Sequence, residues 1–395
     1  MSTTNRDESY IVDVVQQSAP VDVTQPYDTA SLKGKSILIT GGASGFGAAF
    51  ARHWASHGAH IAIGDINDAA GEELVAELRS LPGSSGHHHF QHCDVTRWED
   101  QLALFQEAAR ASPTGGIDAV VANAGVLETD NVITGKGFEN PSGLDLDQDP
   151  RPPPPPLRCL AVNLTGVMYT VHLALYWLPR NEEPKHGRTD SRVGDGDGDG
   201  DYSAPDTVAT ATRPRDRHLL LTGSVAGIMA LPGQPEYTAS KHAVTGLFRS
   251  LRGTARVNQG VRVNMLCPYF VETPLIPRPG MLLLAGAGFA SIGDVVDAGT
   301  RLMADESVVG RALVIGPGLS VVDGEDGDGL GPLGGEEGGV RSRAVWECYA
   351  DDYEKVDLFS QRYVRLLNQF TKLRGWAGTL KDILSVIVYR RKVRA

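Results

Sequence analysis

A short apolar segment that ends in a cluster of glycines constrains the fold of this chain most. Residues 36–40 read SILIT, residues 41–47 read GGASGFG, and an apolar helical segment follows directly. A strand, a glycine turn and a helix in this order begin a βαβ unit, because the backbone must turn sharply where the strand ends. The pattern therefore predicts an α/β fold with a parallel sheet.

The same alternation of elements continues along the chain. The predicted strands are 36–40, 60–65, 90–93, 119–122, 218–221, 261–265 and 312–315. The predicted helices are 46–58, 68–81, 98–111, 157–178, 237–257 and 294–304. Strands that are short and apolar throughout are typical of a sheet buried on both faces. We expect a Rossmann-like, doubly wound parallel sheet of about seven strands, with helices on both faces.

Composition divides the chain into a core and several appendages. The core is predicted to span 31–318, after a flexible N-terminal arm at 1–30. Two disordered insertions are expected, near 127–156, which holds a run of five prolines, and near 181–216, which contains GDGDGDGD. Alternating Asp-Gly can ligate calcium, but a single run is more typical of a linker.

The C-terminal part of the chain has a different composition. A Gly-rich and acidic linker is expected at 319–342, followed by a helical extension at 343–395. From Trp346 onward apolar residues recur at steps of three or four, which is a helical period. The stripe could pack on its own domain or on a second subunit, and the basic end RRKVRA leaves a membrane-surface helix open.

Charge and cysteine usage exclude several kinds of partner. The 395 residues include 37 Lys and Arg against 48 Asp and Glu, a net charge of -11, which would repel a nucleic acid backbone. The four cysteines are scattered and form neither a disulfide framework nor a CxxC metal pair. The first ten residues carry acids and no apolar run, and nowhere do 18 apolar residues follow one another. These features predict a cytoplasmic protein with no metal site and no transmembrane segment.

The glycine turn is suited to a phosphate ligand. Glycines let the backbone approach a pyrophosphate, and the amides at the start of the next helix attract it. Asp65 ends the second predicted strand, near the interval at which an acid meets the adenosine ribose in dinucleotide-binding units. A carboxylate there would repel the extra phosphate of NADP, and no Arg stands beside it. We therefore expect NAD as the cofactor, with NADP not excluded.

Several motifs in order resemble the short-chain dehydrogenase/reductase family, from about residue 32 to residue 318. The chain carries TGxxxGxG from Thr40 to Gly47, the sequence NAG from Asn123 to Gly125, and YxxxK from Tyr237 to Lys241. The resemblance implies a catalytic tetrad of Tyr237, Lys241, Ser224 and Asn163. It also implies cofactor contacts from Gly41, Ser44, Gly45, Phe46, Gly47, Asp65, Asp94, Val95, Asn123, Ala124, Gly125, Tyr237, Lys241, Pro268, Val271 and Thr273.

The residue types of the tetrad suit proton transfer. A phenol with a pKa of about 10 is a poor base at neutral pH, so a neighbour must favour its anion. Lys241 stands one helical turn after Tyr237 and supplies a positive charge on the same face. Ser224, 13 residues before Tyr237, is expected to orient the substrate oxygen. Asn163 matches the family residue that holds a water linking the lysine to solvent.

Departures and similarities near residue 270 bear on the substrate. After Pro268 the family usually has a glycine, and this chain has Tyr269, which would be strained if the position needed a positive φ. The segment from 274 onward is apolar, so we expect a hydrophobic secondary alcohol or ketone as substrate, contacted by 281–284 and Phe289.

The motifs are nearest to members such as 15-hydroxyprostaglandin dehydrogenases, and family members are usually homodimers or homotetramers. A non-catalytic dinucleotide sensor and an interaction scaffold on the same fold remain alternatives.

Overall fold

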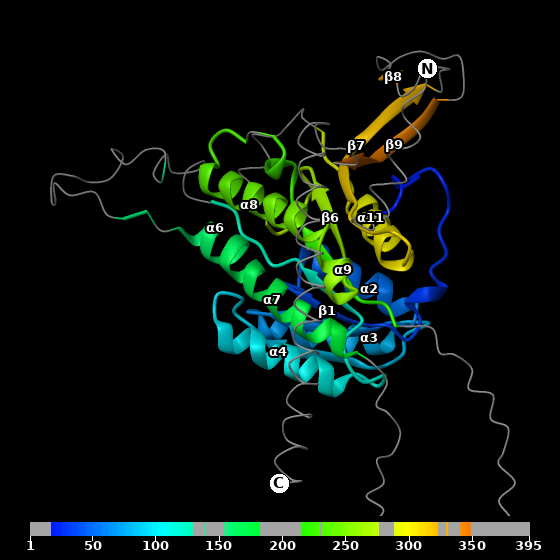
Figure 1. The fold of residues 1–395 in the computed structure, drawn as a ribbon, viewed down its shortest axis with the longest axis vertical. Helices are drawn as coiled ribbons and strands as arrows, with labels where there is room; N and C mark the ends of the chain where they lie inside the picture. The colour runs from blue at the N-terminus through cyan, green and yellow to red at the C-terminus, as the bar shows by residue number, and fades with distance from the viewer. Residues whose placement is uncertain are drawn as a thin grey trace, which may run out of the picture.

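A computed structural model shows the arrangement of the chain (Figure 1). It describes residues 17–128, 138, 154–155, 157–181, 215–229, 231–275, 288–322, 329–330 and 340–348.

One sheet of nine strands forms the centre of the described structure, in the order β3-β2-β1-β4-β5-β6-β7-β8, with β9 also paired to β7. Its strands are β1 (Ser36–Thr40), β2 (His60–Asp65), β3 (His88–His92), β4 (Ala119–Ala122), β5 (His218–Thr222), β6 (Arg262–Pro268), β7 (Ala312–Val322), β8 (Gly329–Leu330) and β9 (Val340–Cys348). The first seven strands pair in parallel, whereas β8 and β9 run antiparallel to β7. The strand order reverses between β1 and β4, where a doubly wound sheet opens a crevice for a ligand. The predicted fold class is confirmed.

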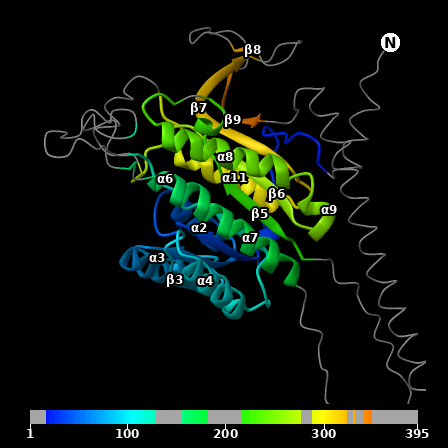
Figure 2. The same ribbon diagram turned by 60° about the vertical axis from the view of Figure 1, so that its left-hand side comes forward.

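Helices cover both faces of this sheet. The structure contains η1 (Ala30–Leu32), α2 (Gly45–Ser56), α3 (Asp68–Ser80), α4 (Trp98–Ala111), α6 (Arg158–Leu160), η3 (Ala161–Gly166), α7 (Val167–Trp177), η4 (Leu178–Arg180), η5 (Val225–Gly227), α8 (Pro235–Leu251), α9 (Ala255–Gln259) and α11 (Ile292–Ala304). Helices α2, α3 and α11 share one apolar core, and α4, α7 and α8 share the other. Side chains of β1 alternate between the two cores: Ile37 and Ile39 enter the first, and Leu38 enters the second. Figure 2 shows α4, α7 and α8 lying side by side on their face.

Helix α7 continues α6 and η3, so that residues 158–180 form one long apolar helix. By length and mean hydropathy this segment could cross a membrane, with 44% of the most apolar window buried. Val171, Leu173 and Ala174 pack into the core shared with α4 and α8. A soluble core helix has the same properties, and the place of this helix in the sheet-covering layer accounts for its apolar character.

The N-terminal segment differs from the predicted flexible arm over residues 17–30. The backbone amide of Ser18 donates to the carbonyl of Val309, and the amide of Val21 donates to the carboxylate of Glu347. Val23 and Tyr27 pack against the core of α2 and α11. The prediction was wrong for this part because its few apolar residues find partners far away in the sequence.

The C-terminal prediction also needs correction. Strand β7 continues to residue 322, and residues 340–348 form β9, where a linker and the start of a helix were expected. In Figure 1, β7 and β9 form a long ribbon that extends away from the rest of the sheet. Pairing with β7 satisfies the backbone of β9, which outweighs the helical spacing of the side chains. The remainder of the predicted helix, 349–395, lies outside the described residues.

The ends of the two predicted insertions are ordered. Leu127 and Glu128 belong to the loop after β4, and Asn181, Arg215 and Asp216 make buried hydrogen bonds and ion pairs. The proline run except for residues 154–155, and the Asp-Gly run, lie outside the described residues.

Candidate active site

The glycine loop joins β1 to α2 and forms one wall of a groove of about 530 Å³. Gly41 has a φ of +63°, and a Cβ there would lie 2.6 Å from the Cα of Ala124. Only glycine therefore allows the loop to lie against the segment after β4. The side chain of Ser44, the N-cap of α2, makes no capping hydrogen bond, so the first amides of this helix stay available for an anion.

Most predicted cofactor residues line this groove. They are Gly41, Ser44, Gly45, Phe46, Asp65, Asp94, Val95, Asn123, Ala124, Gly125 and Thr273. Gly47 lies behind the loop, where a Cβ would approach the carbonyl oxygen of Gly41 to 2.4 Å. Pro268 and Val271 line an adjoining cavity instead. The groove, the glycine cradle and the uncapped helix start fit a dinucleotide.

Asp65 stands at the end of β2 and is already engaged with the loop. Its carboxylate accepts hydrogen bonds from the backbone amides of Ala43, at 3.0 Å, and Asn67, at 3.0 Å. Arg158 is the one cation among the described residues that line the groove, and it is not among the predicted cofactor contacts.

The loop after β4 lies between the glycine loop and the catalytic helices. The side-chain Nδ2 of Asn123 donates to the carbonyl oxygens of Thr40 and Gly41, at 3.1 and 2.9 Å. Asn163, fully buried in the π-helical turn η3, holds the backbone of Val126 by two hydrogen bonds, of 2.8 and 2.9 Å. The side chain of Asn163 therefore fixes this loop, a role that the sequence did not indicate.

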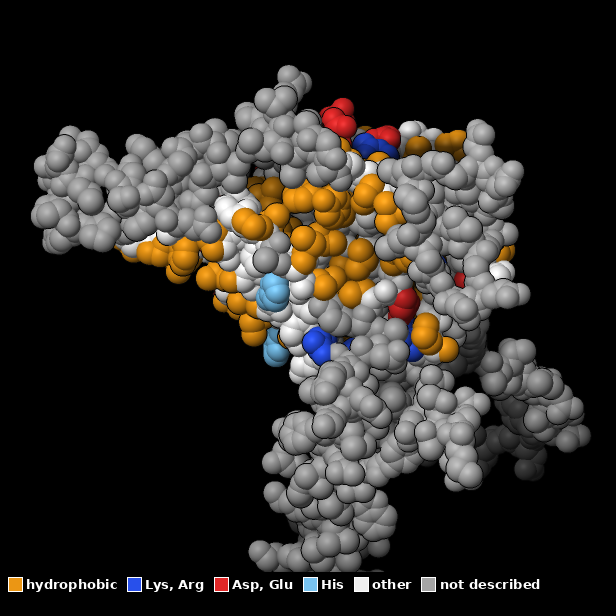
Figure 3. All heavy atoms as spheres, turned by 90° about the horizontal axis from the view of Figure 1, so that it is seen from above, with side chains coloured by type: hydrophobic (Ala, Val, Ile, Leu, Met, Phe, Trp, Pro, Cys, Tyr) orange, Lys and Arg blue, Asp and Glu red, His pale blue; other side chains and the backbone are white. Residues whose placement is uncertain are grey.

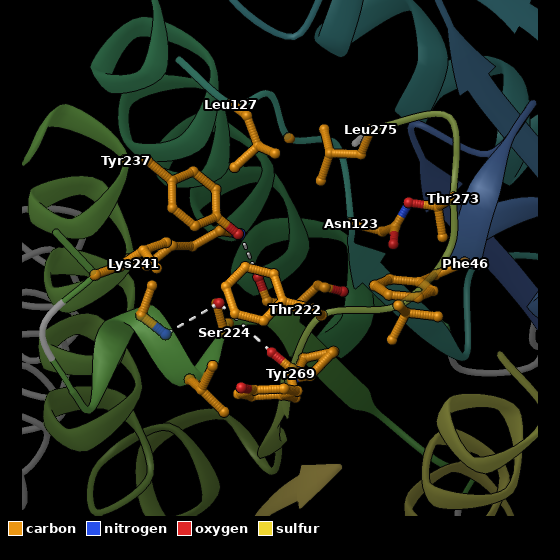
Figure 4. Close-up of a pocket in the computed structure, with 18 of the residues that line it drawn as sticks. Phe46, Asn123, Leu127, Thr222, Ser224, Tyr237, Lys241, Tyr269, Thr273 and Leu275 are labelled. Carbon is orange, nitrogen blue, oxygen red and sulfur yellow. Dashed lines mark hydrogen bonds between the residues drawn. The ribbon is translucent and has the colours of Figure 1, made fainter. Parts of the chain in front are cut away.

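Tyr237, Ser224 and Lys241 meet at the floor of the adjoining cavity, which has a volume of about 110 Å³ (Figure 4). Ser224 follows β5, and its hydroxyl group hydrogen-bonds the Tyr237 phenol. The Lys241 ammonium donates to the carbonyl of Thr222 at 2.9 Å and lies 5.7 Å from the Tyr237 ring centre. The structure thus brings the three predicted catalytic side chains together, and Asn163 lies behind them, hydrogen-bonded to Ser240.

Burial changes the ionisation of both titratable groups. It raises the pKa of Tyr237 to about 12, although the hydrogen bond from Ser224 acts in the opposite direction. It lowers the pKa of Lys241 to about 8, against the influence of Cys267 and Cys159. Burial is therefore the main influence on the pKa of Tyr237 and raises it, whereas the sequence interpretation expected Lys241 to lower it.

The cavity above the phenol is mainly apolar. Its hydrophobic lining consists of Phe46, Leu127, Val225, Ala226, Met229, Leu231, Pro268, Tyr269, Phe270, Val271 and Leu275. Figure 4 shows Leu127 and Leu275 on the side opposite Tyr269, with the Tyr237 hydroxyl directed into the space between the two leucines and Tyr269. Phe46, Asn123, Gly125 and Thr273 line both this cavity and the groove, so the two are continuous.

Two predictions about this cavity need correction. Among the described residues Leu157 is the only non-glycine with a positive φ, so Tyr269 is not strained in the way that its position suggested. The Tyr269 ring instead packs edge-on against Phe270, at 4.8 Å between ring centres. Phe289 is exposed and does not line the described cavity, and residues 281–284 lie outside the described part of the chain.

Comparison with known sequences identifies the family. The family model described as short chain dehydrogenase matches residues 35–188 and 214–278. The chain belongs to this family. The match covers the glycine loop, the segment after β4, Ser224 and the YxxxK helix, and it is interrupted where the Asp-Gly run occurs.

Characterised relatives are dehydrogenases. A 5'-hydroxyaverantin dehydrogenase of Emericella nidulans is 36% identical over 75% of this chain and 88% of its own length. A 5'-hydroxyaverantin dehydrogenase of Dothistroma septosporum is 35% identical over 78% of this chain and 94% of its own. This short-chain dehydrogenase is therefore an NAD(P)-dependent oxidoreductase that acts on a CH-OH group.

A solved structure shows the same fold. A short-chain type dehydrogenase/reductase from Mycobacterium marinum superposes with a TM-score of 0.53 at 20% sequence identity, over 73% of this chain and 96% of that one.

Proposed function

We propose that this short-chain dehydrogenase interconverts a hydrophobic secondary alcohol and its ketone, with Tyr237 as the general acid and base. One observation carries the proposal: the phenol of Tyr237 points into an apolar cavity that opens directly into the groove beside the glycine loop. The reacting carbon can therefore lie beside the phenol while a nicotinamide cofactor occupies the groove. The cofactor supplies or accepts the hydride when bound.

The residues of the protein would divide the remaining work. Ser224 is placed to hold the substrate oxygen close to the phenol, which takes the alcohol proton during oxidation and returns it during reduction. The Lys241 ammonium lies beside this pair and stabilises negative charge as it develops. Asn163 keeps the loop after β4 in place, and a water held at Asn163 would connect Lys241 with solvent.

The apolar lining supports a hydrophobic substrate. Both fungal relatives are named for 5'-hydroxyaverantin, so this compound belongs in the first substrate panel. Oxidation of 5'-hydroxyaverantin, steroid, aromatic and fatty alcohols should be compared with that of small polyols at equal concentration. Preference for the small polyols would contradict the proposal.

For the cofactor we propose a preference for NAD, because the Asp65 carboxylate lines the groove at the end of β2 and would repel a 2'-phosphate. Relatives from Phoma sp. and Cochliobolus lunatus, 29% and 27% identical, are named NADP-dependent dehydrogenases. The ratio of kcat/KM for NAD to that for NADP tests the point, with Asp65→Ser expected to move the ratio toward NADP. A wild-type preference for NADP would overturn it.

We also propose a cytoplasmic homodimer or homotetramer that associates through the helices carrying Asn163 and Tyr237. Met168 and Tyr176 on α7 are 52% and 50% exposed, and an exposed apolar patch can mark an interface between subunits. Figure 3 shows that hydrophobic side chains also dominate the described surface seen from above. Light scattering measures the subunit number, and a monomer at micromolar concentration would contradict the proposed assembly.

A further inference from the structure

Helix α8, which carries Tyr237, begins without a cap of its own. Its N-cap residue, Gln234, makes no side-chain capping hydrogen bond, and the first helical residue, Pro235, has no amide hydrogen. The amides of Glu236 and Tyr237 have no acceptor within the helix, so each needs an acceptor from elsewhere in the chain.

A carboxylate from a distant part of the chain fills this gap. The Oε2 atom of Glu128 accepts from the amide of Glu236 at 3.1 Å and from the amide of Tyr237 at 3.4 Å. The backbone of Glu128 is held as well, because its amide donates to Oε1 of Gln234 at 3.1 Å and its carbonyl accepts from Nε2 of Gln234 at 2.9 Å. Gln234 cannot cap its own helix because its side chain is used on Glu128.

Glu128 also belongs to the loop that connects the groove with the catalytic cavity. Asn123 attaches this loop to the glycine turn, Asn163 attaches it at Val126, and Leu127 lines the cavity. The contacts of Glu128 with α8 are the last described attachment of the loop. The same residue therefore joins the wall that faces the substrate to the helix turn that holds the phenol.

We propose that Glu128 is a positioning residue for proton transfer, acting through the backbone of Tyr237. The proposal rests on the role assigned to Tyr237 above. Loss of the carboxylate frees the first turn of α8, so that the phenol leaves its position relative to Ser224 while the groove keeps its shape. A displacement of about 1 Å can lower turnover by about two orders of magnitude. The anion also complements the positive start of the helix.

The test compares Glu128→Ala with Glu128→Gln in the full-length protein. We expect kcat to fall by about 10- to 100-fold in Glu128→Ala, with KM for the cofactor nearly unchanged. Glu128→Gln keeps an oxygen that can accept both amides, so its kcat should stay close to wild type. Hydrogen exchange at the amides of Glu236 and Tyr237 should quicken in the alanine variant and not in the glutamine variant.

Asp28→Ala is the matched control, since Asp28 also accepts a backbone amide, that of Ala30, far from the cavity. A wild-type kcat in Glu128→Ala would overturn the proposal, as would equal changes in kcat, cofactor KM and melting temperature in both Glu128 variants. Tyr237→Phe distinguishes a failure of the proposed function from a failure of the role of Glu128. If that variant stays active, the proposed function fails; if it is inactive while Glu128→Ala is fully active, only the role of Glu128 fails.

Discussion

The two edges of the parallel sheet differ in how their charges are compensated. At the carboxyl edge, Ser224 after β5 and Lys241 on α8 lie beside an apolar cavity. Lys241 donates to a backbone carbonyl and has no carboxylate partner in the part of the chain described. At the amino edge, buried charges pair directly: Asp216 binds Arg262 at 2.6 Å and Lys35 at 2.7 Å. One edge thus keeps polar groups available for chemistry, and the other uses them to hold the strands together.

The difference follows from the hydrogen-bond acceptors available at each edge. Arg262 is fully buried, and its guanidinium also donates to the carbonyls of Leu302 and Met303 at the end of α11. Such a charge is tolerated only when all its donors are satisfied. At the carboxyl edge the glycine loop and the start of α2 leave backbone amides for a ligand. Stability and function are therefore separable by mutation.

The largest effect is expected at the catalytic phenol. Tyr237→Phe should lower kcat by about 10²- to 10⁴-fold, because it removes the proton-transferring group and little volume. The melting temperature should stay near that of the wild type, as measured by thermal unfolding. Tyr27→Phe is the control, because Tyr27 packs against Arg301 and lines neither the groove nor the cavity. Full turnover in Tyr237→Phe would show that Tyr237 does not transfer the proton.

Next in size is the amino-edge network. Asp216→Asn leaves Arg262 and Lys35 without their buried counter-charge, so the free energy of unfolding should fall by about 3–5 kcal/mol. Urea titration measures the change, and turnover per folded molecule should be retained. Asp68→Asn breaks an exposed pair with His92 and should cost less than about 1 kcal/mol. An equal loss of unfolding free energy in Asp216→Asn and Asp68→Asn would contradict a special stabilising role for the buried charges at the amino edge.

A smaller effect is expected in the glycine loop. Gly47→Ala places a Cβ against the carbonyl oxygen of Gly41 and the side chain of Asn123, and overpacking of this kind costs about 1–3 kcal/mol. Cofactor affinity, followed by quenching of protein fluorescence, should weaken accordingly. Gly246→Ala is the control because its Cβ meets nothing within 4 Å, and alanine favours a helix by up to about 1 kcal/mol. Unchanged cofactor affinity in Gly47→Ala would contradict the packing argument.

The smallest effect concerns acid stability. Burial alone would raise the pKa of Asp216, but Arg262 and Lys35 outweigh it and hold that pKa well below its usual range. A carboxylate with a lowered pKa stabilises the fold above its unfolded pKa of about 3.9, and this contribution is lost as the pH falls through the lower, folded value. The stability difference between wild type and Asp216→Asn should therefore shrink below about pH 4. A difference that stays constant down to pH 2 or so would contradict this.

Local pattern was sufficient for the elements that repeat. The strands from Ser36 to Pro268 and most of the helices between them were predicted within a few residues, because their apolar side chains recur at the period of a strand or a helix. The predicted helix 237–257 is instead divided into α8, which ends at Leu251, and α9, which begins at Ala255. Around Trp346 the same reasoning failed, since a step of three or four residues carries no information about the edge of β7. Asn181, which is fully buried, and Asp216, whose side chain is 4% exposed, were assigned to an insertion for a similar reason: their partners are remote in sequence.

The sequence by itself determined the family, the dinucleotide-type loop and the YxxxK helix, because these depend on residue types at short fixed spacings. Only the tertiary structure decided what surrounds them. It placed Tyr269 without strain beside Phe270, raised the pKa of Tyr237 by burial, and brought Glu128 to a helix that begins 107 residues later, at Pro235. Burial and long-range hydrogen bonds depend on segments that meet only when the chain has folded, so no local pattern could specify them.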